Sequence, residues 1–237
     1  MRKPVTLMAG LHGSRHFGTQ PFLTEALRAT REERPSALYI GAASGDDRTF
    51  GTALCGLLTA AGAGEVVWPK LGAGRNGAAA RAALARVDLV FVGGGDVDAG
   101  MQALRSADVV DDLHAAAARG AVFAGMSAGS IMLGERWIRW PNAAAGDDAA
   151  ETYQCLGIAR CSLDTHGEGD DWGEARSFAA VRARELGKKT RAYGVPSGGA
   201  LVVSPGGKVQ ARGVPVAVFA AAPRRAAKLE DTLPVNS

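Results

Sequence analysis

Ser127 lies at the centre of a short pattern that could carry nucleophilic chemistry. The run Gly125-Met126-Ser127-Ala128-Gly129 places one glycine two residues before the serine and another two residues after it. Residues 121–124, ahead of the pattern, are small or apolar, and residues 130–133, behind it, fit a helix. A strand, a sharp turn with a serine at its apex and a helix together make a nucleophile elbow. We therefore predict Ser127 as an exposed nucleophile. A glycine-rich turn with an incidental serine is the alternative interpretation.

A serine must lose its proton during attack, so a base has to lie beside it. The chain has four histidines. His166 follows a predicted strand and comes after the serine along the chain, and we favour it as the base. His12 and His16 follow the first predicted strand and could line the same edge of a sheet. His114 falls inside a predicted helix, where a surface position is the simpler interpretation.

The acid that orients the imidazole is left open among four carboxylates. Glu168 comes two residues after His166, so the two side chains point to the same side of an extended segment. Glu151, Asp147 and Asp148 lie between the nucleophile and the base, and each also fits a solvated loop charge. We predict Glu151 and Glu168 ahead of the two aspartates.

A tetrahedral intermediate needs N–H donors for its oxyanion. The residue after the nucleophile, Ala128, is a natural source of one donor. The glycines Gly93-Gly94-Gly95 follow an apolar run, Asp88 to Val92, that predicts a buried strand. We expect Gly94 or Gly95 to supply the second donor, because a glycine backbone can approach a substrate closely. The other interpretation, a phosphate-binding turn, is weak because the rest of the G-x-G-x-x-G pattern is missing.

The elements that must position these residues alternate between strands and helices through residue 133. Apolar runs at residues 5–9, 37–40, 65–68, 88–92 and 121–124 predict strands, and helical patterns separate them. This order predicts an α/β fold with a mostly parallel sheet and helices on both faces. The carboxyl ends of such strands share one edge, which would bring the glycine run and Ser127 together. The later residues 200–203 and 208–213 predict an antiparallel hairpin. We predict one α/β domain over residues 1–222 and a flexible tail over 223–237.

The composition bounds the classes of function. The net charge is +3, from 27 basic and 24 acidic residues spread along the chain, which gives no indication of nucleic-acid binding. Cys55, Cys155 and Cys161 lack a metal-ligand spacing, so we expect no metal and no cofactor. They fit a reduced, cytoplasmic setting. No apolar run approaches the length of a membrane span, so we expect no membrane partner.

Three motifs together resemble peptidase family S51, which holds aspartyl dipeptidase (peptidase E) and cyanophycinase. They are residues 91–96, residues 125–130 and Asp164-Thr165-His166, and the resemblance covers about residues 5 to 220. It implies a fold like that of class I glutamine amidotransferases, with serine replacing their cysteine. It also implies a serine peptidase that acts on short peptides, with Ser127 as nucleophile and His166 as base.

The loop after the histidine, residues 167–172, is acidic. It could attract a substrate amino group, as in a dipeptidase or aminopeptidase. It argues against cyanophycin, since the cyanophycinases that resemble this chain carry arginines there. Two further interpretations remain. The first is a non-catalytic small-molecule or peptide-binding protein on the same scaffold. The second, glutamine amidotransfer, is disfavoured because no cysteine occupies the elbow. A homodimer is left open.

Overall fold

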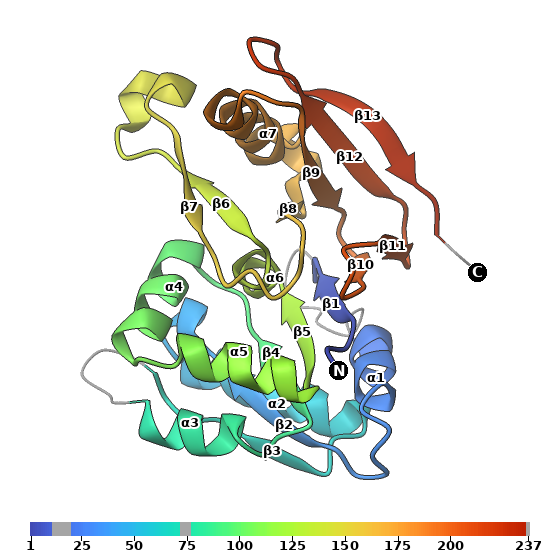
Figure 1. Ribbon diagram of the computed structural model, residues 1–237. Helices are drawn as coiled ribbons and strands as arrows, with labels where there is room; N and C mark the ends of the chain where they lie inside the picture. The colour runs from blue at the N-terminus through green and yellow to red at the C-terminus, as the bar shows by residue number, and fades with distance from the viewer. Residues whose placement is uncertain (11–19, 72–76, 236–237) are drawn as a thin grey trace.

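The computed structural model describes residues 1–10, 20–71 and 77–235 of the 237-residue chain. A seven-stranded sheet, in the order β11-β10-β1-β5-β4-β2-β3, runs through the N-terminal half and takes in the later hairpin (Figure 1). Its strands are β1 (Val5–Met8), β2 (Ser36–Ile40), β3 (Glu65–Val67), β4 (Leu89–Val92), β5 (Val122–Met126), β10 (Ala200–Val203) and β11 (Val209–Arg212). Strands β3, β2, β4, β5 and β1 pair in parallel, and the β10–β11 hairpin joins β1 antiparallel. The predicted fold class is confirmed.

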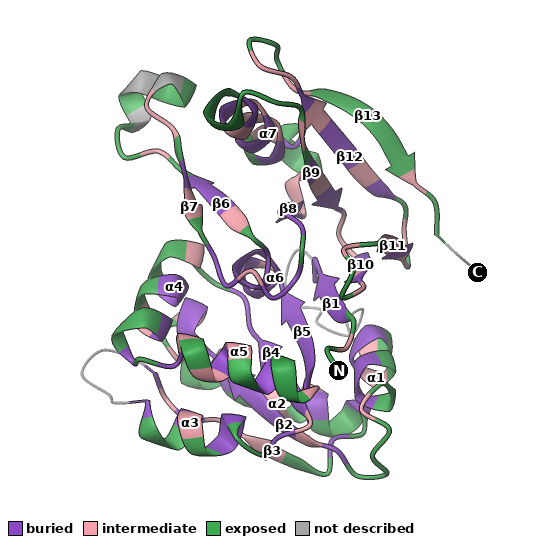
Figure 2. Ribbon diagram, viewed as in Figure 1, coloured by how far each residue is buried: buried purple, intermediate pink, exposed green. Residues whose placement is uncertain are grey.

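Strands β4 and β5 carry no polar side chain, because both of their faces are covered. In β4, Leu89 and Phe91 belong to one hydrophobic cluster, whereas Val90 and Val92 belong to the other. Helices α1 and α2 pack in the first cluster, and α3, α4 and α5 pack in the second. Figure 2 shows the resulting purple strands between helices with one green face. The helices are α1 (Gln20–Arg28), α2 (Arg48–Ala61), α3 (Ala78–Leu84), α4 (Val97–Ser106), α5 (Val110–Arg119), α6 (Ala128–Leu133) and α7 (Gly173–Leu186).

The second half of the chain builds a separate layer above the carboxyl ends of the parallel strands (Figure 1). A four-stranded sheet has the order β13-β12-β9-β8, and α7 packs on β9 and β12. A two-stranded sheet pairs β6 with β7. These strands are β6 (Arg136–Arg139), β7 (Glu151–Gln154), β8 (Leu163–Thr165), β9 (Thr190–Val195), β12 (Val216–Ala221) and β13 (Lys228–Leu233). Short 3-10 turns lie at Ala42–Ser44, Ala143–Asp148 and Gly167–Asp170.

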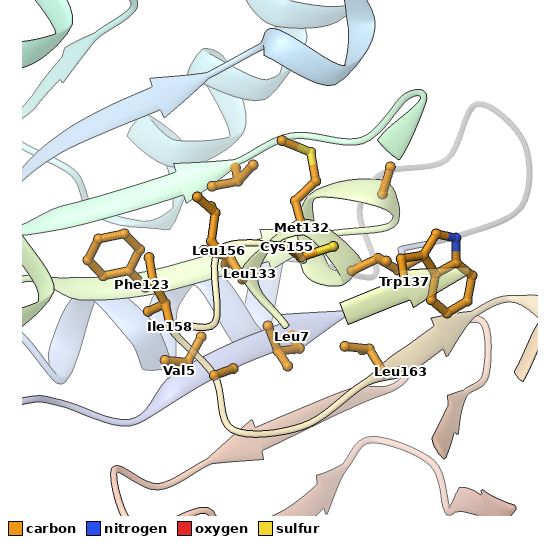
Figure 3. Close-up of a cluster of buried hydrophobic side chains, with 14 of the residues drawn as sticks. Val5, Leu7, Phe123, Met132, Leu133, Trp137, Cys155, Leu156, Ile158 and Leu163 are labelled. Carbon is orange, nitrogen blue, oxygen red and sulfur yellow. The ribbon is translucent and has the colours of Figure 1, made fainter. Parts of the chain in front are cut away.

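The two layers share one apolar cluster, which fixes their relative position. Figure 3 shows Phe123 and Leu7 of the large sheet in the same cluster as Met132 and Leu133 of α6. Leu163 of β8 belongs to it as well, and it is fully buried. The strand that leads to His166 is therefore packed on the same core as the elbow helix.

The prediction of a flexible tail from residue 223 is wrong for residues 228–233, because these residues form strand β13. β13 pairs antiparallel with β12, although five of its six residues are exposed. Its outer position explains the polar sequence that concealed it. Glu230 accepts hydrogen bonds from Lys189 and from Arg191, the latter at 2.6 Å, which ties β13 to the neighbouring part of the sheet. None of the helices that the structure describes is long and apolar enough to cross a membrane.

Candidate active site

The strand-to-helix turn between β5 and α6 holds Ser127 in a rare backbone conformation. Its φ is 53° and its ψ is −126°, a region that costs a non-glycine residue on the order of 1–3 kcal/mol. The Ser127 N–H donates to the Met8 carbonyl at 2.9 Å, so the end of β1 supports the strained turn. Its neighbours in the turn, Met126 and Ala128, are buried, whereas Ser127 is partly exposed. Strain of this kind, paired with an accessible hydroxyl, is typical of a functional turn.

The two glycines of the pattern are required by close packing inside the elbow. A Cβ atom on Gly125 would lie 2.7 Å from the Gly129 carbonyl oxygen, and a Cβ on Gly129 would lie 2.1 Å from that of Val92. Both distances are below any ordinary van der Waals contact. The elbow helix can therefore reach the end of β4 only with glycine at both positions.

His166 lies beside the serine, as the sequence predicts. The Ser127 Oγ and His166 Nε2 atoms are 2.8 Å apart, within hydrogen-bonding distance. His166 follows β8 in a left-handed conformation, with a φ of 48° and a ψ of 33°. Its N–H donates to the Val195 carbonyl at 2.9 Å, which fixes the backbone against β9. In the tautomer that carries its proton on Nδ1, Nε2 accepts the hydrogen bond of the hydroxyl.

Of the other three histidines, only His114 lies in the described part of the structure, and it is not brought to this pair. His114 lies in α5, next to a different cavity that contains neither Ser127 nor His166. His12 and His16, which the sequence places after the first strand, are outside the described residues.

A cavity of about 960 Å³ opens onto Ser127 and His166. The elbow forms one part of its wall and the loop after β8 forms another. Aromatic side chains from the β6–β7 region, Trp137, Trp140 and Tyr153, supply a further part. Six carboxylates also line it: Asp96, Asp98, Asp164, Glu168, Asp170 and Glu174. Arg139 is the one Lys or Arg among the described lining residues, and it forms an ion pair with Glu151 at 2.6 Å.

The four predicted acids lie in different places. Glu168 lines the cavity, and proximity to His166 is one of the causes that lower its pKa. Burial, the largest single influence, raises the pKa of Glu168, but Ser197, the Glu168 main chain and His166 together lower it below its usual value. Glu151 of β7 forms an ion pair with Arg139 of β6 and is not among the described lining residues.

Asp147 lies away from the proposed base as well. It accepts hydrogen bonds from Trp140 Nε1 at 3.1 Å and from the Ser177 hydroxyl at 2.8 Å, and it does not line the described cavity. The side chain of Asp148 is outside the described part of the structure. Of the described candidates, only Glu168 shares the cavity of Ser127 and His166.

Two of the three predicted oxyanion donors, Ala128 and Gly94, lie next to the serine, whereas Gly95 packs against Ala43. Ala128 is the first residue of α6, where an N–H has no acceptor within the helix. A Cβ on Gly94 would lie 3.1 Å from Ser127 Cβ, so the glycine turn closely approaches the elbow. The N–H groups of Gly93 and Asp96 are bonded to the carbonyls of Ile40 and Ala43, at 2.9 and 2.8 Å. Within the described residues, those of Gly94 and Gly95 have no such acceptor.

Asp164 lines the cavity as well, although the sequence indicates it only as part of the Asp164-Thr165-His166 motif. It is buried, with 6% of its surface exposed, and Thr165 donates its N–H to Oδ1 at 2.7 Å. Burial, together with repulsion from Glu174, raises the pKa of Asp164 to about 7. The sequence does not indicate that Asp164 is buried, because an aspartate in a short strand is ordinarily expected to face solvent.

Within the described residues, no group of three or more His, Cys, Asp or Glu side chains is arranged to hold a metal ion. All three cysteines are unpaired, Cys155 and Cys161 are buried, and none of the three lines the cavity of Ser127 and His166. Burial raises the pKa of the Cys155 thiol to about 12 and also raises that of Cys161. These thiols are therefore protonated and poorly nucleophilic at neutral pH.

The chain matches the model of peptidase family S51 over residues 6–211. The chain belongs to peptidase family S51. The predicted resemblance is thereby confirmed, and the membership supports a peptidase. No curated protein matches the chain.

Two solved structures share the fold of this chain at low sequence identity. A peptidase from an acI-B1 Actinobacterium is 16% identical, with a TM-score of 0.71, over 99% of this chain and 97% of that one. A protein from Listeria monocytogenes EGD-e described as peptidase E is also 16% identical, with a TM-score of 0.64, over 90% of this chain and all of that one. Both likenesses concern the arrangement of the backbone.

Proposed function

We propose that this S51 protein is a serine peptidase that hydrolyses short peptides through an acyl-enzyme. Ser127 is the nucleophile, His166 is the base and Glu168 is the acid that favours the charged imidazole. The 2.8 Å separation of Ser127 Oγ and His166 Nε2, at the mouth of a cavity, carries the proposal. The serine–histidine geometry meets the requirement for a nucleophile within hydrogen-bond reach of its base.

The reaction has two halves. His166 takes the proton of Ser127 as Oγ bonds to the scissile carbonyl carbon. The tetrahedral intermediate collapses, the C–N bond breaks, and the same proton passes to the leaving amine. Water then attacks the ester while His166 takes one of its protons, and that proton passes to Ser127 Oγ as the acyl C–O bond breaks and the acid product leaves. No net charge or electron is gained over the cycle.

Backbone N–H groups stabilise the negative oxygen of each tetrahedral intermediate. Ala128 supplies one donor and the Gly94–Gly95 turn supplies the other. In serine peptidases, removing one such donor lowers kcat by a factor of roughly 10²–10³. The close packing of the glycine turn on Ser127 supports this assignment.

The charge of the cavity favours a substrate with a free amino group close to the scissile bond, as in a dipeptidase or aminopeptidase. Among the described lining residues, six carboxyl groups accompany one guanidinium, which is already paired. Asp164, with its pKa of about 7, adds only part of a charge at neutral pH. Such a field attracts a cation and repels a carboxylate side chain. The aromatic wall adds favourable contact for a cationic or apolar residue. The expected cytoplasmic location stays a prediction.

A library of free and N-acetylated dipeptides and tripeptides tests this function. We expect cleavage of free peptides, a much higher KM for their acetylated forms, and a weaker preference between the two at high salt. In Ser127→Ala, kcat should fall by a factor on the order of 10⁴–10⁶. Cleavage at an undiminished rate by Ser127→Ala would refute the nucleophile. Equal cleavage of both peptide forms would refute the exopeptidase specificity.

A binding protein on the same scaffold is the alternative function. Its elbow would serve only as a turn, so peptides would bind without being cleaved. Calorimetry with the same library separates the two: binding to native protein without turnover at any pH favours the alternative.

A further inference from the structure

Glu168 is held by a residue that no sequence motif indicates. The Ser197 N–H donates to Glu168 Oε1 at 2.8 Å. The side chain and the main chain of Ser197 both contribute to lowering the pKa of Glu168. Ser197 lines the same cavity as Ser127 and His166. One residue thus supports the proposed acid with its main chain and its side chain.

The backbone that carries Ser197 is anchored on both sides. It follows the end of β9, where Val195 accepts the N–H of His166 at 2.9 Å. The next residue, Gly198, donates to the Gly10 carbonyl at 2.9 Å, and Gly199 accepts the N–H of Ala9 at 3.0 Å. Ser197 is therefore tied both to the strand beside His166 and to the end of β1, beside the elbow.

Glu168 itself has little other support. It lies in the short turn Gly167–Asp170, and its side chain is exposed. A glutamate side chain loses roughly 1.5–2 kcal/mol of rotamer freedom when it is fixed. Attraction to the charge of His166 alone would have to offset that loss, whereas the hydrogen bond from the anchored Ser197 main chain reduces the freedom before any substrate binds.

We propose that Ser197 is a positioning residue that holds the Glu168 carboxylate, ionised, beside His166. This rests on the proposed function, since it assigns a role within the Ser127–His166–Glu168 set. Ser197 acts through Glu168: its donors keep the carboxylate charged and turned toward the imidazole, which favours the protonated ring during catalysis.

The test is a comparison of three serine variants of the full-length enzyme on its best peptide. In Ser197→Ala, which keeps the backbone donor, we expect kcat/KM to fall about 3- to 10-fold. The acid limb of its pH profile should move to lower pH, because a less well-held carboxylate favours the protonated imidazole less. Ser197→Thr keeps a hydroxyl and should restore both values. Ser177→Ala is the matched control, since it removes an exposed serine–carboxylate bond, to Asp147, outside the cavity.

A double-mutant cycle shows whether Ser197 acts through Glu168. In a Glu168→Gln background, Ser197→Ala should change kcat/KM less than 2-fold and leave the acid limb in place. An equal loss in both backgrounds would overturn the positioning role, as would an unchanged pH profile in Ser197→Ala. If the native enzyme cleaves no peptide, the proposed function itself fails. If it cleaves peptides and only this cycle is additive, the proposed function stands and the role of Ser197 is refuted.

Discussion

The elbow and the loop after β8 position the proposed catalytic side chains by opposite means. Ser127 is fixed by buried packing: two glycines in close contact, a strained backbone and neighbours in the core. Glu168 and Ser197 are fixed by hydrogen bonds at a more open surface, beside a buried strand. Substitutions that disturb the elbow are therefore expected to lower the stability of the fold together with the activity. Substitutions around the proposed base and acid are expected to lower the activity by smaller, pH-dependent amounts and to leave the fold stable.

The largest expected effect lies in the packed region. Gly129→Ala puts a Cβ 2.1 Å from the Val92 carbonyl oxygen, so β4 and α6 must separate. We expect a loss of roughly 3 kcal/mol or more of unfolding free energy, measured by urea denaturation. Gly56→Ala is the control: Gly56 is exposed in α2 with open space around it, and the change should stabilise the protein by up to about 1 kcal/mol. Equal effects of the two variants would contradict the packing account.

A smaller, catalytic effect is expected in the hydrogen-bonded region. Glu168→Gln should lower kcat by about 10- to 100-fold, or roughly 1.4–2.7 kcal/mol. It should leave the urea midpoint close to that of the native protein, because the side chain is exposed. Glu151→Gln breaks only the surface pair with Arg139, so its kcat should be nearly unchanged. A larger loss in Glu151→Gln than in Glu168→Gln would move the acid to β7.

The smallest expected effect concerns the buried carboxyl below the loop. The pKa of Asp164 is raised to about 7 by burial, so the folded state binds a proton more tightly than the unfolded chain. Its stabilising contribution is complete at low pH and is lost as the pH rises from about 4 through about 7. Asp164→Asn should remove this dependence and stabilise the protein at pH 8 by roughly 1–2 kcal/mol. Urea denaturation at pH 5 and pH 8 measures it, and a difference of the same size at both pH values would contradict the titration.

The sequence predicts the first region better than the second for a physical reason. Local apolar runs predict the buried parallel strands. The two glycines of the G-x-S-x-G pattern predict the turn, because only glycine fits where the backbone packs so closely. Ser197 and Asp164 depend on contacts between segments distant in the chain, with no local pattern. The sequence of β13 does not predict a strand, because an exposed edge strand needs little apolar surface. The partner of Glu151, Arg139, likewise comes from the register of β6 on β7, which spacing alone does not show.

Covalent labelling with a fluorophosphonate, located by mass spectrometry, tests the central claim most directly. The account predicts a single adduct on Ser127, formed at least about 100-fold more slowly in His166→Ala and at the native rate in Ser177→Ala. An adduct on another serine, or equal labelling rates with and without His166, would contradict a Ser127–His166 catalytic pair.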